Sequence, residues 1–420
     1  MLGLLLTILP TLIGAWWISI HGFRPARLCD IGVVWLLLFF GWFFGTPVFI
    51  GWITGSISWI TSVILGFALL FIGLICRNSD LRACYGYERI GFHSLLSRLR
   101  SLTFMEHTFL IFPFFIFFTL FLIGTLLPFR TYDAIGYHSH NPVGWVLISH
   151  FSLHHFGIPE AHPTGNVFIT YANIKGIWPF LIMDYNRNMV GTATTQTAFI
   201  LLLFSALVCI WRRFDFSLKW CGFACIFCLV SPEVLLQSLD LYSDLAYLSA
   251  SVSLLSVLVI LTQDAKFTLM KLLPACSGFL LITGLKPSGF LLAAGFGLVY
   301  LIALYNAEEI SRFARLRNSV VGFLFVVFFS VATAGYWPIK SLLVYGNPFY
   351  PFGFQIGPYS FPGIPTAASP SDHSELYLNS SGISAWWQVV SEQVRTTDLG
   401  HWHNGLGAAF FVMGIPAIVA

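Results

Sequence analysis

Residues 108–138 read TFLIFPFFIFFTLFLIGTLL followed directly by PFRTYDAIGYH. The first part carries no charged side chain, and about 20 such residues cross a bilayer as a helix. Ionisable groups follow at once, with Arg130, Asp133 and His138 close together. This stretch therefore predicts a transmembrane helix that ends near Leu127 and a carboxylate, Asp133, at the membrane surface.

The composition of the whole chain extends this interpretation. Of the 420 residues, 57% are hydrophobic and only 9% are charged. A soluble domain carries about 25% charged residues, so most of the apolar surface must face lipid. The net charge is only +3 and no basic patch is present. Nucleic acid is therefore not expected as a partner.

Apolar segments of spanning length recur along the chain. They predict an all-α polytopic membrane protein with about eleven transmembrane helices: Leu2–Ile20, Gly32–Gly51, Ile53–Ile75, Thr108–Leu127, Thr195–Trp211, Trp220–Leu236, Leu245–Leu261, Phe267–Leu285, Gly289–Tyr305, Val320–Trp337 and Leu406–Ala420. The first is expected to be a retained helix, because no basic region or cleavage site accompanies it. The last is still apolar at Ala420, so we expect a longer natural chain.

The Lys and Arg residues predict the orientation of these helices. Strict alternation of the eleven spans places fifteen of the 21 on one side, which the positive-inside rule makes cytoplasmic. The other side receives two long segments, 128–194 and 338–405, both rich in aromatic residues. We expect them to carry interfacial helices. All eight cysteines fall in spans or inner loops, so no disulfide framework is expected.

The segments divide the chain into three parts. Residues 1–107 hold the first transmembrane helices and a basic cytoplasmic loop. Residues 108–352 form a transmembrane core that includes the first outer loop, 128–194. Residues 353–420 hold most of the second outer loop and the final helix.

Several ionisable groups share the outer surface in this topology. They are Asp133, Glu233, Asp240, Asp244 and Lys286, together with nine of the 12 histidines. Such groups near hydrocarbon are costly and usually mark function. A carboxylate can accept a proton from a hydroxyl nucleophile, and a lysine can hold a phosphate. The simpler alternatives are a helix cap for Asp133, a solvated turn for Asp240 and Asp244, and a snorkelling anchor for Lys286.

No metal site is predicted. His150 and His154 share a helix face, but Phe151 stands where a zincin motif has glutamate. A divalent cation near Asp133 is left open. Cys221, Cys225 and Cys228 form one helical stripe, which we interpret as small apolar residues in a lipid-embedded helix.

Two motifs carry a resemblance to a known family. The segment Asp133-Ala-Ile-Gly-Tyr137-His138 resembles the Asp-x-x-x-Tyr-His segment in the first outer loop of GT-C glycosyltransferases. The segment Tyr345-Gly-Asn-Pro-Phe-Tyr-Pro-Phe352 is similar to a Gly-Asn-Pro-x-Tyr-Pro-Phe motif late in many bacterial members. The resemblance implies a GT-C-like fold, a catalytic role for Asp133 and an acidic residue in the region of Asp240 and Asp244. From their chemistry and their expected place at the outer surface, Tyr137, His138, Asp240, Asp244, Lys286 and Arg130 are the residues expected to bind the substrate.

The expected function follows from this resemblance. It is an inverting hexosyltransferase that moves a sugar from a polyprenyl-phosphate donor to a glycan, lipid or protein acceptor, at the outer face of a bacterial inner membrane. Two alternatives stay open. One is a polysaccharide polymerase or ligase with a similar donor, and the other is a lipid-linked-sugar flippase or transporter. Transporters usually carry ionisable groups near the bilayer midplane, whereas these spans are nearly free of central charge.

Overall fold

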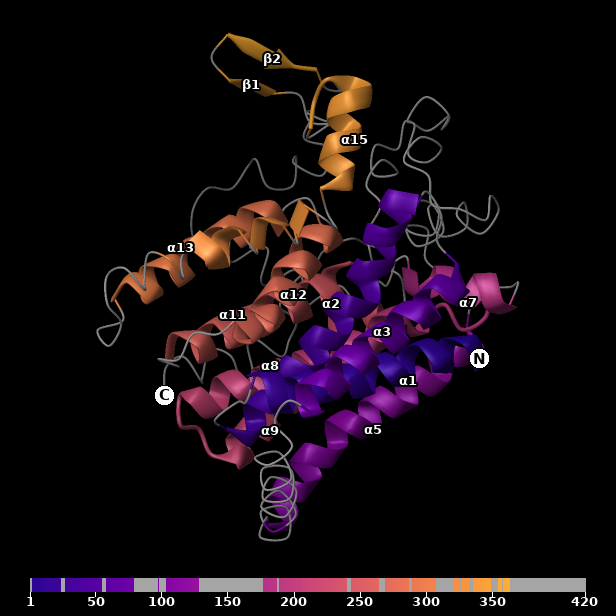
Figure 1. Cartoon of the computed structure of the whole chain (residues 1–420). Helices are drawn as coiled ribbons and strands as arrows, with labels where there is room; N and C mark the ends of the chain where they lie inside the picture. Colours follow the sequence, from indigo (N-terminus) through magenta and orange to yellow (C-terminus); the bar gives the residue numbers. More distant parts are fainter. Residues whose placement is uncertain are drawn as a thin grey trace, which may run out of the picture.

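The computed structural model describes residues 2–23, 27–54, 58–78, 97, 103–127, 177–186, 189–239, 243–263, 269–286, 289–306, 317, 320–324, 326–328, 330–331, 335–348, 354–356 and 358–362. The described chain is almost entirely helical. The long helices lie side by side, with α5 at one edge and α13 at the other (Figure 1). The short helix α15 and the hairpin β1–β2 stand beyond them, at the top of the view.

The elements follow one another in a simple order. They are α1 (Leu2–Trp17), η1 (Ile18–Phe23), α2 (Leu28–Thr54), α3 (Trp59–Asn78), α5 (Phe104–Leu126), α7 (Ile177–Asn186), α8 (Thr194–Arg213), α9 (Leu218–Leu229), α10 (Pro232–Ser238), α11 (Asp244–Gln263), α12 (Leu269–Leu285), α13 (Gly289–Asn306), α15 (Tyr336–Tyr345), β1 (Phe354–Ile356) and β2 (Tyr359–Phe361). The two strands pair antiparallel, with Phe354 opposite Phe361.

Six helices in the described part of the chain are long and apolar enough to cross a membrane. They correspond to the first five expected spans and the seventh, and α9, α12 and α13 are shorter apolar helices. The side chains of Ile111, Phe115, Phe118 and Leu122 on α5 are all more than half exposed, as a face toward lipid requires. The chain is therefore an all-α protein of multi-pass membrane type. The number of eleven spans stays a prediction.

Contacts between helices fix their relative directions. Trp35 of α2 donates from Nε1 to the carbonyl of Leu12 in α1, and Ser256 of α11 donates to the carbonyl of Ala206 in α8. Gly41 of α2 faces Ser277 of α12. These contacts are combined with those between α1 and α3, α2 and α8, α5 and α8, and α11 and α12, which are described below. Together they show that α1, α3, α8 and α11 run in one direction and that α2, α5 and α12 run in the opposite direction. This agrees with the alternation predicted from the sequence.

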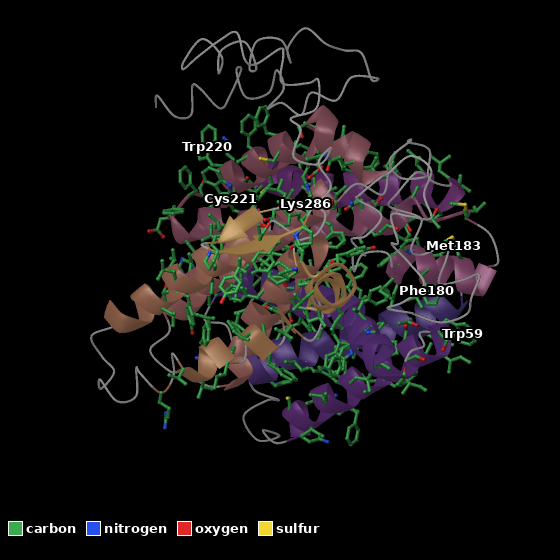
Figure 2. The ribbon with its side chains drawn as sticks, turned by 90° about the horizontal axis from the view of Figure 1, so that it is seen from above. Trp59, Phe180, Met183, Trp220, Cys221 and Lys286 are labelled. Carbon is green, nitrogen blue, oxygen red and sulfur yellow. The ribbon has the colours of Figure 1, made fainter. Side chains whose placement is uncertain are left out.

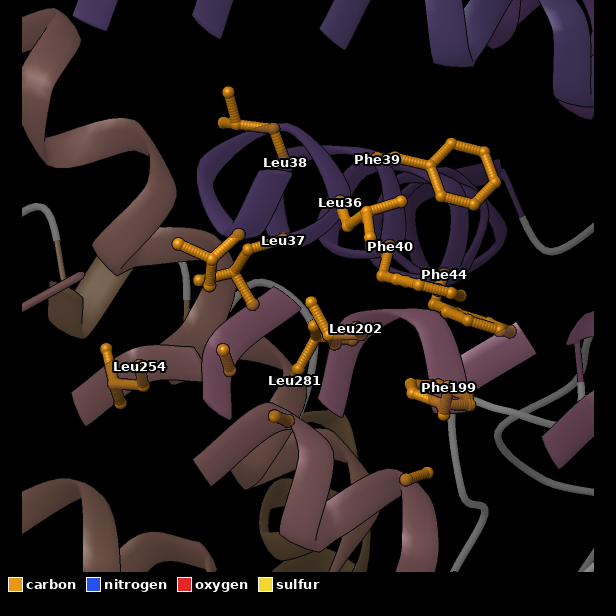
Figure 3. Close-up of a cluster of buried hydrophobic side chains, with 14 of the residues drawn as sticks. Leu36, Leu37, Leu38, Phe39, Phe40, Phe44, Phe199, Leu202, Leu254 and Leu281 are labelled. Carbon is orange, nitrogen blue, oxygen red and sulfur yellow. The ribbon is translucent and has the colours of Figure 1, made fainter. Parts of the chain in front are cut away.

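The core lies where α2, α8, α11 and α12 meet. Phe40 and Phe44 of α2 stack on Phe199 of α8, with ring centroids 4.6 and 5.6 Å apart. Leu254 of α11 and Leu281 of α12 lie on the other side of this cluster (Figure 3). All these side chains are buried, and aromatic pairs add to the free energy of burial. The core therefore holds α8, α11 and α12 in fixed positions relative to one another.

Two expected spans differ from the structure. The segment 220–236 is interrupted at Val230 and Ser231, between α9 and α10, because Pro232 has no N–H to continue the helical ladder. Trp337, the last residue of the expected segment 320–337, lies in helix α15, which begins at Tyr336. In the segment 128–194, the described helix α7 has its apolar side chains packed inside the protein. Whether other helices of that segment lie at the membrane interface stays a prediction.

Helices α1 and α3 pack backbone against backbone. A Cβ added to Gly14 would lie 2.6 Å from the carbonyl carbon of Leu69, and one added to Gly73 would lie 2.9 Å from the carbonyl oxygen of Gly14. Small residues allow this close approach, which stabilises helix pairs in lipid through van der Waals contact. Farther along the same pair, the guanidinium of Arg77 lies over the ring of Trp17.

Replacing Gly14 by alanine is expected to lower the free energy of unfolding by about 1–3 kcal/mol, because neither backbone can yield without separating α1 from α3. Thermal unfolding in detergent measures this. Gly295→Ala on α13 is the matched control, since nothing lies within 4 Å of the added carbon. That variant is expected to be neutral or slightly more stable, because alanine favours a helix over glycine. Equal losses in both variants would contradict the close packing at Gly14.

Candidate functional site

The predicted site residues fall into two groups. Asp244 and Lys286 belong to the described structure, whereas Asp133, Tyr137, His138, Arg130 and Asp240 lie outside the described residues. The structure brings Asp244 and Lys286 together. The ammonium of Lys286 pairs with the carboxylate of Asp244.

The ion pair follows from the antiparallel packing of α11 and α12. Asp244 is the first residue of α11, and Lys286 directly follows the last residue of α12. Helix dipoles favour an anion at the first position and a cation at the second. Contact between Gly278 and Leu254 sets the register that places the two charged ends side by side. We call this end of the helix bundle the Lys286 end.

Both charged side chains are only partly covered. The side chains of Lys286 and Asp244 retain 30% and 40% of their exposure. Viewed from above, Lys286 lies in the middle of the projection, between Cys221 of α9 and Phe180 of α7 (Figure 2). Its ammonium is also 5.8 Å from the ring centroid of Tyr247, one turn along α11. Partly exposed ion pairs contribute only about 0–1 kcal/mol, so this pair can open at low cost.

Partial burial lowers the pKa of the Lys286 ammonium from its usual range, because the charged form loses part of its hydration. The Asp244 carboxylate and the Tyr247 ring are the groups that favour the charged form. Lys286 is therefore a cation that needs an anionic partner in this position. Asp244 is that partner in this structure.

The amide of Gln237 completes the start of α11. Its oxygen accepts a hydrogen bond of 2.8 Å from the backbone N–H of Leu245. This N–H belongs to the first turn, where helical partners are absent. Because Gln237 lies in α10, the bond joins α10 to α11 directly beside Asp244.

The first turn of α8 lies at the same end and is polar yet buried. Thr194, Thr195, Gln196 and Thr197 are all at most 2% exposed. The hydroxyl of Thr197 donates to the carbonyl of Ser238 at the end of α10, 2.7 Å away. The indole of Trp178 donates to the hydroxyl of Thr194. This turn is therefore joined to α7 and α10 by side-chain hydrogen bonds.

Gln196 is the exception in this turn. Among the residues that the structure describes, neither its amide nitrogen nor its amide oxygen has a hydrogen-bond partner, although the side chain is completely buried. A buried amide without partners costs stability and needs an explanation, which a bound polar group or water can supply. Sequence reasoning missed Gln196, because a single glutamine at the start of an apolar segment resembles an ordinary helix boundary.

Replacing Gln196 by leucine is expected to raise the free energy of unfolding by about 1–3 kcal/mol, since two unpaired polar atoms are removed from the interior. Thr197→Val is the matched control in the next position. It removes a hydroxyl that is bonded to Ser238, so it is expected to destabilise the protein. Thermal unfolding of both variants in detergent tests this. A loss of stability in Gln196→Leu would show that the amide has partners.

The motif that runs from Tyr345 to Phe352 begins at the end of helix α15. Gly346 ends α15 in the left-handed conformation, with a φ of +67° that glycine adopts without strain. Asn347 is fully buried, and its side-chain amide donates to the carbonyl of Pro362, 2.7 Å away. Pro362 follows strand β2, so Asn347 joins the end of α15 to the base of the hairpin. The described part of the motif therefore has a structural role.

The opposite end of the bundle holds a buried ion pair that the sequence analysis did not identify. Asp30, in the first turn of α2, is fully buried and pairs with the guanidinium of Arg213 at the end of α8. The thiol of Cys209 lies 3.2 Å from a carboxylate oxygen of Asp30, and the thiol of Cys29 lies 3.5 Å from the same oxygen. We call this the basic end. The sequence signal that could have revealed this ion pair is Asp30 itself, an acidic residue at the start of a long apolar segment.

The basic end is held by a further hydrogen bond, in which Arg27 donates to the carbonyl of Arg212 over a distance of 3.0 Å. The seven cysteines that the structure describes are free thiols. In the described ranges, no three His, Cys, Asp or Glu side chains form a group that could hold a metal ion. A divalent cation near Asp133 stays open, because that residue lies outside those ranges.

Comparison with known proteins gives no match to a family model, a curated protein or a solved structure.

Proposed function

We propose that this chain is an integral-membrane glycosyltransferase of the hexosyltransferase type. It transfers a sugar from a polyprenyl-phosphate donor to an acceptor at the Lys286 end of the helix bundle. The observation that carries the proposal is the Asp244–Lys286 pair, a cation and a carboxylate brought together from two different helices at one end of the bundle. Such a pair suits a substrate with an anionic head and an apolar tail.

The position of Asp133 in the chain supports this assignment. Asp133 follows Leu127 by six residues, and the carbonyl of Leu127 accepts from the N–H of Gly191, just before α8. Gly124, also near the end of α5, approaches Thr194. The end of α5 therefore lies at the Lys286 end. The segment with Arg130, Asp133, Tyr137 and His138 directly follows this helix end in the sequence.

The proposed step is a single inverting displacement. The acceptor oxygen attacks the anomeric carbon of the donor sugar, and the bond from that carbon to the phosphate oxygen breaks. Asp133 takes the proton of the acceptor, and Lys286 with Arg130 neutralises the departing polyprenyl phosphate. Tyr137, His138 and Asp240 would contact the sugar or the acceptor. One displacement needs no covalent intermediate on the enzyme.

The resemblance of the two motifs to bacterial GT-C glycosyltransferases supports a bacterial inner membrane, and the distribution of Lys and Arg supports an active site on its outer side. The acceptor is a glycan, a lipid or a protein. A polymerase or ligase with a similar donor belongs to the same reaction class and differs in the acceptor.

A lipid-linked-sugar flippase is the second candidate, and the interruption between α9 and α10 favours it. Discontinuous helices commonly form substrate sites in transporters. However, the break lies near one end of the bundle, since Ser238 at the end of α10 is bonded to the first turn of α8. The described ion pairs likewise lie at the two ends.

Sugar transfer by the purified full chain in detergent separates the candidates. The protein is incubated with a panel of polyprenyl-phosphate sugars and lipid, glycan or peptide acceptors. Acceptor-dependent transfer is the expected result. Movement of the donor lipid across reconstituted vesicles, with no transfer from any donor, would support the flippase instead.

A further inference from the structure

Lys286 is already paired with a group of the protein itself. Its ammonium is bound to Asp244 and lies over Tyr247. Among the side chains described at this end of the bundle, Lys286 carries the positive charge available to an anion. A phosphate that binds Lys286 must therefore either displace Asp244 or share the ammonium with a second anion at close range.

We propose that Lys286 and Tyr247 form the phosphate subsite of the lipid-linked donor, and that Asp244 is an exchangeable counter-ion. The phosphate displaces Asp244 when it binds, and Asp244 returns when the phosphate leaves. The identity of the ligand as a polyprenyl phosphate rests on the proposed function. The exchange at Lys286 does not, because it concerns phosphate binding alone.

Three features of the pair support exchange. Both side chains are partly exposed, so a phosphate can approach without unfolding a helix. Asp244 is the first residue of α11, and the backbone N–H of Leu245 in this turn donates to the side chain of Gln237 rather than to Asp244. The carboxylate can therefore move while the helix start stays intact. Tyr247 lies in α11 like Asp244, and its ring is close enough to attract the ammonium of Lys286. This contact keeps the ammonium in place while Asp244 and the phosphate exchange.

The donor and the product carry different charges, so the exchange would affect how easily each of them leaves Lys286. The phosphate of a polyprenyl-phosphate sugar is a diester with one negative charge. The polyprenyl phosphate released by transfer is a monoester with about −1.5 to −2 charges at pH 7. The product would therefore hold Lys286 more strongly than the donor does. A competing carboxylate beside the ammonium favours release of the product, and this assigns Asp244 to product release.

The test measures phosphate binding by the purified full chain in a neutral detergent, with dodecyl phosphate as the probe. Titration calorimetry gives the dissociation constant for the wild type, Asp244→Asn and Lys286→Met. Asp244→Asn is expected to bind about tenfold more tightly, because the competing anion is gone and asparagine still suits a helix start. Lys286→Met is expected to lose measurable binding. Lys271→Met, at the other end of the same helix α12, is the matched control and is expected to bind as the wild type does.

Inorganic phosphate forms the second arm. Tighter binding of both probes by Asp244→Asn would show that the head group alone is recognised. Tighter binding of dodecyl phosphate alone would show that the alkyl chain is required as well. Unchanged or weaker binding of both probes by Asp244→Asn would overturn the exchange, and so would wild-type binding by Lys286→Met. Thermal unfolding confirms that each variant is folded, and Lys286→Arg, which keeps the charge, is expected to retain binding.

The result is independent of the transfer assay. Tighter phosphate binding by Asp244→Asn without transfer from any donor would leave the subsite standing and reject the glycosyltransferase. Transfer by the wild type with unchanged phosphate binding in Asp244→Asn would do the reverse. Where transfer is observed, Asp244→Asn is further expected to be inhibited by about tenfold less polyprenyl phosphate than the wild type.

Discussion

Replacing Asp30 by asparagine is expected to lower the free energy of unfolding by about 3–5 kcal/mol, the usual cost of removing one partner from a buried ion pair. The Asp30 carboxylate is completely buried, and Arg213 is only 8% exposed. Without the carboxylate, the buried guanidinium would lose the Asp30 partner that compensates its charge. The packing of α2 against α8 should also be weakened, because the pair joins the start of α2 to the end of α8.

Unfolding by heat or by a denaturing detergent measures this loss. The informative control is the double variant Asp30→Leu with Arg213→Met. Apolar residues in place of a buried ion pair are often neutral or even stabilising, since the cost of burying two charges is removed. The double variant should therefore be clearly more stable than Asp30→Asn. If the two are equally unstable, the carboxylate acts through the thiols of Cys29 and Cys209 rather than through Arg213.

The helices of the bundle were largely predictable, because a run of about 20 apolar residues has few structural alternatives. Helix α5 begins at Phe104, before the expected Thr108, since Thr103 and Glu106 form a capping box at its start. The interruption at Ser231 depends on one proline inside an apolar run, and hydrophobicity alone does not reveal it. Pattern and propensity therefore located the helices better than their ends.

The candidate site was predictable in part. Alternation of the spans places Asp244 and Lys286 on one side, and the structure shows that they touch. The contact depends on which helices are neighbours, and this is set by packing such as that of Gly278 against Leu254. The same limit explains why Gln196 and Asp30 were missed. Their importance lies in burial and in partners, which a single sequence does not contain.

Replacing Asp133 by asparagine is expected to lower the rate of sugar transfer by about 10²–10⁴-fold, the usual contribution of a general base. Asparagine has nearly the same shape but cannot take the proton of the acceptor. The binding of dodecyl phosphate should be unchanged, because the phosphate is assigned to Lys286. Initial rates with a saturating donor, measured beside phosphate titrations, separate the two effects. This prediction rests on the proposed function.

Asp215→Asn is the matched control for that experiment. It is the same substitution in the short connection between α8 and α9, at the basic end. Asp215 has a φ of +59°, a conformation that asparagine also adopts readily, so this variant should fold and transfer sugar as the wild type does.

Full activity of Asp133→Asn would move the base to another carboxylate at the Lys286 end. Asp240 and Asp244 are the candidates. Asp240 belongs to the short connection between α10 and α11, four residues before Asp244 in the sequence, and Asp244 contacts Lys286. The two can be told apart by how their asparagine variants fail. Loss of the base lowers the rate of the first turnover itself, whereas loss of a residue that assists product release spares the first turnover and slows later ones. A single-turnover measurement on each variant therefore decides whether Asp244 accepts a proton or only competes for Lys286.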